Sequence, residues 1–209
     1  MLDWIMHIDV KMGEFITLHG AWIYALLFAI IFGETGLVLL PLLPGDTLLF
    51  AAGSFAGLGL MDPWLLIGLL IVAAMLGNTV NALIARWIYA QYGDAIFSGR
   101  LKWLDQNALL KTQAFFDKHG GKALILARFL PVVRTFAPFV AGIARMPWGR
   151  FQMYNAAGAV IWVGGLVVAG ILFGNLPIVR QYLNVIILGG IAAAVVPTVA
   201  GVVWKIVKK

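Results

Sequence analysis

GKALILARFLPVVRTFAPFVAG, residues 121–142, combines features that an ordinary spanning helix does not have. The stretch is apolar, yet it contains Arg128, Arg134, Pro131 and Pro138. One arginine at the centre of a spanning helix costs roughly 2.5–3.5 kcal/mol on insertion scales. Pro131, between the two arginines, and Pro138 are the predicted breaks of the helix, because each proline removes a backbone donor. Broken backbone at membrane depth is tolerated where it is buried in protein or lines a water-filled cavity. We therefore predict a re-entrant hairpin whose two guanidinium groups face a cavity.

A second interpretation of this stretch is a continuous helix with two snorkelling or paired arginines. In the first interpretation the guanidinium groups have a chemical task. They stay charged and match phosphate or carboxylate oxygens in pairs. Arg128 and Arg134 are therefore the predicted residues of an anion-binding site.

The composition places the chain among polytopic membrane proteins and argues against a soluble domain. Of its 209 residues, 62% are hydrophobic and only 11% are charged. The net charge of +6 is spread along the chain, which favours membrane topology and anionic lipid contact over nucleic-acid binding. Cysteine is absent, and the three histidines lie near predicted water boundaries, so we expect no metal site and no cofactor.

The hydrophobic pattern predicts an all-α membrane protein of one domain, with about four spanning helices and two opposed re-entrant hairpins. The expected order along the chain is an interfacial amphipathic helix at 1–18, a first half at 21–90 with a re-entrant segment at 41–59, a surface helix at 104–119, and a second half at 121–204 with a re-entrant segment at 121–142. The expected spans are 21–40, 64–90, 152–174 and 184–204. Lysine and arginine counts place both termini in the cytoplasm.

The first re-entrant segment repeats the pattern of the second. Pro41, Pro44 and Gly45 prevent a straight helix there, and Asp46 follows the break, where it can cap a new helix. Paired interrupted segments in two halves of a chain are typical of transporters built from inverted repeats.

Glu34 and Asp46 are acids in strongly apolar surroundings. An acid poised between desolvation and a nearby arginine can take up and release a proton at working pH. Together with the arginines they predict proton-linked movement of an anionic substrate. Alternatively, the acids only neutralise the arginines in a structural cluster.

Two stretches carry a family resemblance: GETGLVLLPLLPGDTLLFAAG at 33–53 and GGKALILARFLPVVRTFAPFVAG at 120–142. They resemble the signature stretches of the DedA family, also called SNARE-associated or VTT-domain membrane proteins. The resemblance implies a fold like that of transporters with two opposed re-entrant hairpins, and a bacterial cytoplasmic membrane. It also implies recycling of a polyprenyl-phosphate lipid carrier and membrane homeostasis driven by the proton gradient, whereas eukaryotic relatives scramble phospholipids. The functional acids of the family fall on Glu34 and Asp46, and its functional arginines on Arg128 and Arg134.

One departure from the family pattern lies in the span at 64–90. Many members carry Gly-Asp, a following Tyr and Gly-Arg where this chain has Gly77-Asn78, Ala82 and Ala85-Arg86. Asn78 carries no proton, so proton coupling here either differs or relies on the other acids. Asn78 and Arg86 are secondary site candidates.

The leading functional hypothesis is proton-linked flipping of undecaprenyl phosphate, with membrane lipids, the lipid phosphate and protons as partners. Alternatives of the same class are a phospholipid flippase or scramblase and an antiporter for small ions or drugs. An enzyme such as a lipid phosphatase is not expected, because no embedded His or Cys supplies a nucleophile beside a base. A structural assembly factor, and assembly into a homo-oligomer, stay open.

Overall fold

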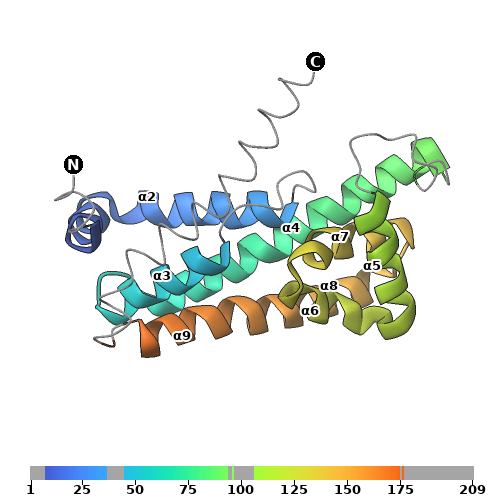
Figure 1. The fold of residues 1–209 in the computed structure, drawn as a ribbon. Helices are drawn as coiled ribbons and strands as arrows, with labels where there is room; N and C mark the ends of the chain where they lie inside the picture. The colour runs from blue at the N-terminus through green and yellow to red at the C-terminus, as the bar shows by residue number, and fades with distance from the viewer. Residues whose placement is uncertain (1–7, 37–44, 94–95, 97–105, 175, 177–209) are drawn as a thin grey trace, which may run out of the picture. The chain divides into compact units, whose positions relative to one another are not determined.

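A computed structural model describes residues 8–36, 45–93, 96, 106–174 and 176, and these residues form helices without a strand. The longest elements are α2 (Ile8–Gly36) and α4 (Pro63–Tyr92), shown in Figure 1. The all-α prediction is thus confirmed for the described residues. The predicted breaks at Pro41 and Pro44, the last predicted span and residues 1–7 of the interfacial helix lie outside them.

Two helical stretches are long and apolar enough to cross a membrane. They are Pro63–Tyr92, of 30 residues, and Trp148–Phe173, of 26 residues. The first begins at Pro63, one residue before the predicted span at 64–90, and the backbone N–H of Leu65 donates to the Asp62 carboxylate at 2.7 Å, which caps the helix start. Large apolar side chains are exposed along both stretches: Leu65, Val72, Leu76, Leu83, Val160, Ile161, Val168 and Leu172. The number of spans and the re-entrant arrangement stay predictions.

The second long stretch is not a uniform α-helix. It consists of α8 (Trp148–Ala159), a π-helical turn at Val160–Gly164 and α9 (Gly165–Phe173). The helix α2 is also kinked, because Gly20 is non-helical, with φ 11° and ψ −91°, just before the first predicted span at 21–40. The described apolar helix after this kink is Gly20–Gly36.

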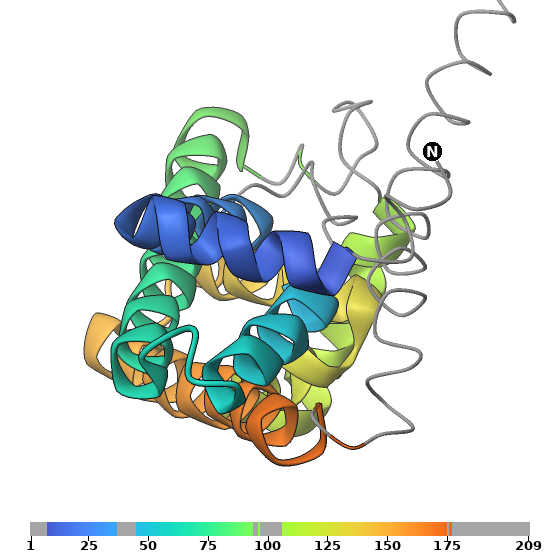
Figure 2. The same ribbon diagram turned by 90° about the vertical axis from the view of Figure 1, so that its left-hand side faces the viewer.

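The helices form two compact units. The first contains the described parts of Met1–Ile30, Leu42–Leu70 and Val163–Lys209. Within it α3 (Gly45–Gly57) lies along α9, as Figures 1 and 2 both show. A side chain on Gly53 or Gly170 would collide with the facing backbone, so glycine allows these two helices their close approach.

The second unit contains Ile31–Pro41, as far as it is described, and the described part of Ile71–Trp162. Here α5 (Gln106–His119) packs on α7 (Pro131–Ile143), and α6 (Ala123–Leu126) packs on α8. The core of this unit includes Ile88, Leu109, Phe136, Phe139, Val140 and Phe151, all buried. The helix predicted at 104–119 thus exists as α5 and buries Leu109; its position on a membrane surface stays a prediction.

The stretch 121–142 is interrupted between its two arginines. After a 3-10 turn at Gly120–Lys122 come α6 and a second 3-10 turn at Ala127–Phe129. Leu130 is extended, with φ −116° and ψ 104°, and α7 begins at Pro131. The helix therefore breaks next to Pro131, whose ring disfavours the helical conformation of the preceding residue. In contrast, α7 continues through Pro138, so the second break that the sequence predicts there does not occur.

Candidate functional site

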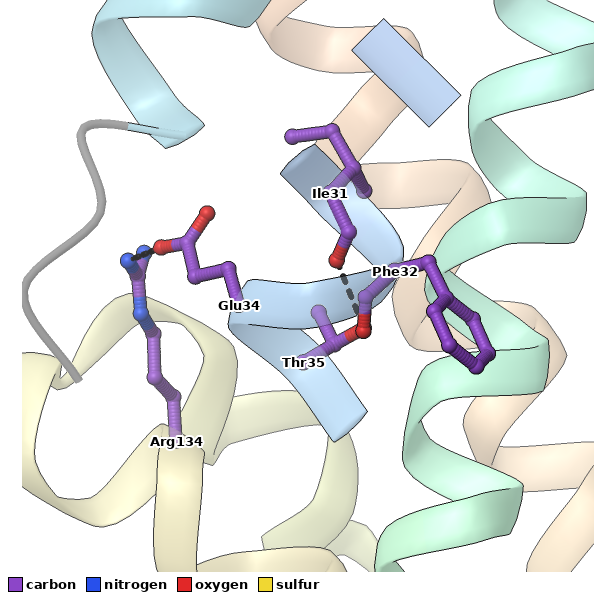
Figure 3. Close-up of polar contacts among 5 residues, drawn as sticks. All are labelled: Ile31, Phe32, Glu34, Thr35 and Arg134. Atoms are coloured by element: carbon purple, nitrogen blue, oxygen red, sulfur yellow. Dashed lines mark hydrogen bonds and ion pairs between the residues drawn. The ribbon is translucent and has the colours of Figure 1, made fainter. Parts of the chain in front are cut away.

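A buried acid and an arginine meet in the second unit. Glu34 lies in the last turn of α2 and Arg134 in the first turn of α7, and Arg134 Nη2 donates to Glu34 Oε1 (Figure 3). The Glu34 side chain is 3% exposed and that of Arg134 is 16% exposed. The break at Leu130 lets a new helix, α7, begin at Pro131, three residues before Arg134.

Arg128 is buried more deeply than Arg134 and has a different kind of partner. It belongs to the 3-10 turn before the break and is 6% exposed. Its Nη2 donates to the side-chain oxygen of Asn155 at 3.0 Å and to the backbone oxygen of Asn155 at 3.3 Å. No carboxylate of the described residues pairs with Arg128, and its Nε has no hydrogen-bond partner among them. Within the described part of the chain, Arg128 is therefore oriented by neutral oxygens, and no negative charge there compensates it.

Both arginines reach one small cavity. Its volume is about 20 Å³, enough for about one water molecule. The lining residues come from α2, α4, the interrupted stretch and the π-helical turn: Glu34, Thr35, Asn78, Leu124, Arg128, Arg134, Thr135, Ala137, Pro138 and Trp162. The site thus contains two guanidinium groups and one carboxylate around a small cavity.

Trp162 is the aromatic partner of both arginines. Its ring centroid lies 5.5 Å from the guanidinium carbon of Arg128 and 5.7 Å from that of Arg134. Both distances fall within the range of cation–π attraction. Trp162 is 4% exposed and belongs to the π-helical turn, a rare element that often occurs at functional sites. The indole face therefore partly offsets the burial of two positive charges.

Buried amides hold the helices around the cavity in place. Asn155 on α8 accepts a hydrogen bond from Asn78 at 2.9 Å, and its own amide nitrogen donates to the backbone oxygen of Met75 at 3.0 Å. Asn81 is fully buried on α4, and its side-chain nitrogen donates to the backbone oxygens of Thr35 and Thr135, at 3.2 Å each. It links the end of α2 to α7, and so the helix that carries Glu34 to the helix that carries Arg134.

The secondary candidates divide between the site and the scaffold. Asn78 lines the cavity and bonds to Asn155. Arg86 does not line it: its guanidinium donates to the backbone oxygen of Met146, and the guanidinium carbon lies 4.2 Å from the ring centroid of Trp148. It connects α4 to the start of α8. Asp46 is exposed in the first turn of α3, in the first unit, so its predicted place beside the arginines stays a prediction.

Asn155, Asn81 and Trp162 are site residues that the sequence patterns above do not predict. Asn155 had a usable signal, because an amide in an otherwise apolar spanning candidate is costly and is kept where it has a partner. Trp162 carried no such signal, since tryptophan is common in membrane helices and its contact with the arginines depends on the π-helical turn.

Comparison with known sequences now adds to this geometry. The sequence model of the VTT domain matches residues 43–172. Protein DedA of Escherichia coli K12 is 44% identical over 206 residues, which is 97% of this chain and 92% of that protein. The chain belongs to the DedA family. Within the family it is also 43% identical to a membrane protein of Mycobacterium leprae over 169 residues, 80% of this chain and 74% of that one.

A more distant DedA family relative is the inner membrane protein YghB of Escherichia coli K12, 34% identical over 160 residues, 77% of this chain and 72% of that protein. No solved structure matches the chain. Family membership and the two span-length apolar helices together make this chain an all-α membrane protein. The family predicted from residues 33–53 and 120–142 is therefore confirmed.

Proposed function

We propose that the chain is a proton-linked transporter of the bacterial inner membrane that flips a polyprenyl phosphate, such as undecaprenyl phosphate, across the bilayer. The observation that carries the proposal is the charge of the cavity. Two guanidinium groups face it, and among the described residues only Glu34 contributes a carboxylate to its lining. Such a site attracts an anion, and the paired N–H groups of each arginine match phosphate oxygens.

The size of the cavity supports a mechanism with at least two conformations. A volume of about 20 Å³ holds roughly one water molecule and no phosphate group. In this proposal the described conformation is therefore the closed one. Binding of the lipid phosphate requires that the helices around the arginines separate, on one side of the membrane and then on the other.

Glu34 links the anion to the proton in this mechanism. In the closed state its carboxylate neutralises Arg134. An arriving phosphate competes for the same guanidinium, and a carboxylate that loses its arginine in a desolvated site takes up a proton more readily. Anion binding and proton uptake then favour each other, because linkage is reciprocal. Asp46 is the second acid proposed for this role. The proposed topology has both termini in the cytoplasm, as the lysine and arginine counts predict.

The test is uptake of undecaprenyl phosphate into proteoliposomes with and without a pH gradient. We expect the wild-type protein to take up undecaprenyl phosphate faster with the pH gradient than without it. The Arg128→Gln variant should lose most of this uptake. Arg150→Gln, the same change on an exposed residue of α8, is the matched control. Movement of a labelled phosphatidylglycerol instead of the polyprenyl lipid would favour the alternative, a phospholipid flippase or scramblase. Movement of neither lipid would contradict both.

A further inference from the structure

We propose that Asn155 is a positioning residue of the anion site, which fixes Arg128 while leaving its positive charge available to a phosphate. This inference rests on the proposed function and assigns a role to a residue outside the charged pair. Asn155 is 1% exposed, on α8, and accepts both hydrogen bonds that Arg128 donates within the described part of the chain.

The hydrogen bonds of Asn155 determine how its amide is oriented. The side-chain oxygen accepts from two donors, Asn78 at 2.9 Å and Arg128 at 3.0 Å. The side-chain nitrogen donates to two oxygens, the backbone oxygen of Met75 at 3.0 Å and the side-chain oxygen of Gln152 at 3.3 Å. A flipped amide would turn its NH₂ group toward the donors of Asn78 and Arg128 and its oxygen toward other oxygens. The neighbours therefore force an oxygen toward Arg128.

A neutral oxygen has a specific consequence at this position. A carboxylate would orient the guanidinium equally well, but it would also neutralise it and occupy part of its fork. The amide orients Arg128 through Nη2 alone and leaves Nε without a partner among the described residues. Gly158, one turn further along α8, keeps the space beside that Nε open, since a Cβ there would lie 2.8 Å from it. Arg128 is thus held in place while its Nε–H group and its positive charge stay available to a phosphate.

Asn155→Asp tests this role, because it keeps the shape and the acceptor and adds a negative charge. Two measurements are made. The first is binding of geranyl monophosphate, the probe, to the detergent-solubilised protein, and the second is uptake of undecaprenyl phosphate by proteoliposomes. At neutral pH we expect Asn155→Asp to bind the probe roughly tenfold more weakly than wild type or worse. On acidification the introduced carboxylate becomes protonated and neutral, so binding relative to wild type at the same pH should recover. Glu34 and Arg134, which also face the cavity, are present in both proteins, and the ratio removes their contribution.

Two further variants separate positioning from packing. Asn155→Ala deletes the acceptor and leaves buried donors unpaired, so its loss of binding should not recover on acidification. Asn107→Asp makes the same amide-to-carboxylate change on the exposed face of α5 and should bind like wild type. Equal binding by Asn155→Asp and wild type at neutral pH, or a loss that acid does not reverse, would overturn the inference. So would a wild-type protein that binds no geranyl monophosphate. Wild type that binds the probe but does not move the lipid would refute only the proposed transport.

Discussion

Replacement of Glu34 by glutamine tests the buried ion pair at the centre of the site. Removing one partner of a buried pair typically costs about 3–5 kcal/mol, because the other charge stays buried and uncompensated. Two features of this site reduce that cost. Glutamine keeps an oxygen that can accept from Arg134, and the Trp162 ring lies 5.7 Å from the guanidinium carbon. We expect the free energy of unfolding to fall by about 1–2 kcal/mol, or Tm by about 2–8 °C.

The functional effect of Glu34→Gln is expected to be larger than its effect on stability. The amide imitates the protonated acid, so binding of a phosphate no longer requires proton uptake. Uptake of undecaprenyl phosphate should therefore lose its dependence on external pH, while affinity stays the same or rises, since no carboxylate competes for Arg134. The assay is uptake into proteoliposomes across a series of external pH values, with Asp117→Asn on the exposed face of α5 as the matched acid-to-amide control.

Two results would contradict the expected role of Glu34. If Glu34→Gln and Asp46→Asn both show normal uptake and the pH profile of wild type, the acids are only structural counter-ions. If Glu34→Gln unfolds at the same temperature as wild type, the ion pair contributes nothing to stability, and the value above is wrong. Thermal unfolding in detergent, with and without geranyl monophosphate, separates the two results. The added phosphate should stabilise Glu34→Gln more than wild type, because it supplies the missing negative charge.

Three further changes test other parts of the site. Arg128→Lys and Arg134→Lys should both lose most uptake, because a point charge does not reproduce a paired fork; full activity of both would reduce the arginines to charge balance. Gly158→Ala should displace Arg128 and lower phosphate binding, since the new Cβ would lie 2.8 Å from Nε, whereas Gly149→Ala on the same helix meets nothing within 4 Å and should bind normally. Asn81→Ala should lower the free energy of unfolding by about 1–3 kcal/mol in thermal melts, because two backbone oxygens lose their donor; an unchanged Tm would contradict that role.

The main features of the interrupted stretch follow from sequence alone. Pro131 disfavours helical backbone at the residue before it, and the extended Leu130 is what that steric rule predicts. The proximity of an acid to an arginine was also predictable in kind, because two buried guanidinium groups need compensation. Charge arguments did not distinguish Glu34 from Asp46, and the structure places Glu34 against Arg134.

Other features depend on how the helices are rotated against each other, and sequence patterns do not specify that rotation. The Asn155 side chain accepts a hydrogen bond from Arg128 because the rotation of α8 directs this side chain toward α6 and the 3-10 turn after α6. Trp162 faces both arginines from a π-helical turn, which no local rule places at Val160–Gly164. Pro138 shows the reverse case. Its ring removes one backbone donor, yet the packed α7 accommodates it, so tertiary contacts outweigh the local preference for a break.

The distribution of charge in the cavity indicates which kind of ligand the site would bind. An embedded arginine costs roughly 2.5–3.5 kcal/mol on insertion scales, so two of them are a substantial burden unless each is compensated. Among the described residues, Arg134 is compensated by Glu34, and Arg128 only by the neutral oxygens of Asn155 and the face of Trp162. Neither neutral partner removes the charge. In the proposed mechanism this remaining positive charge is what a phosphate would relieve on binding, so the residues that make the site costly to bury are also the ones proposed to attract the anion.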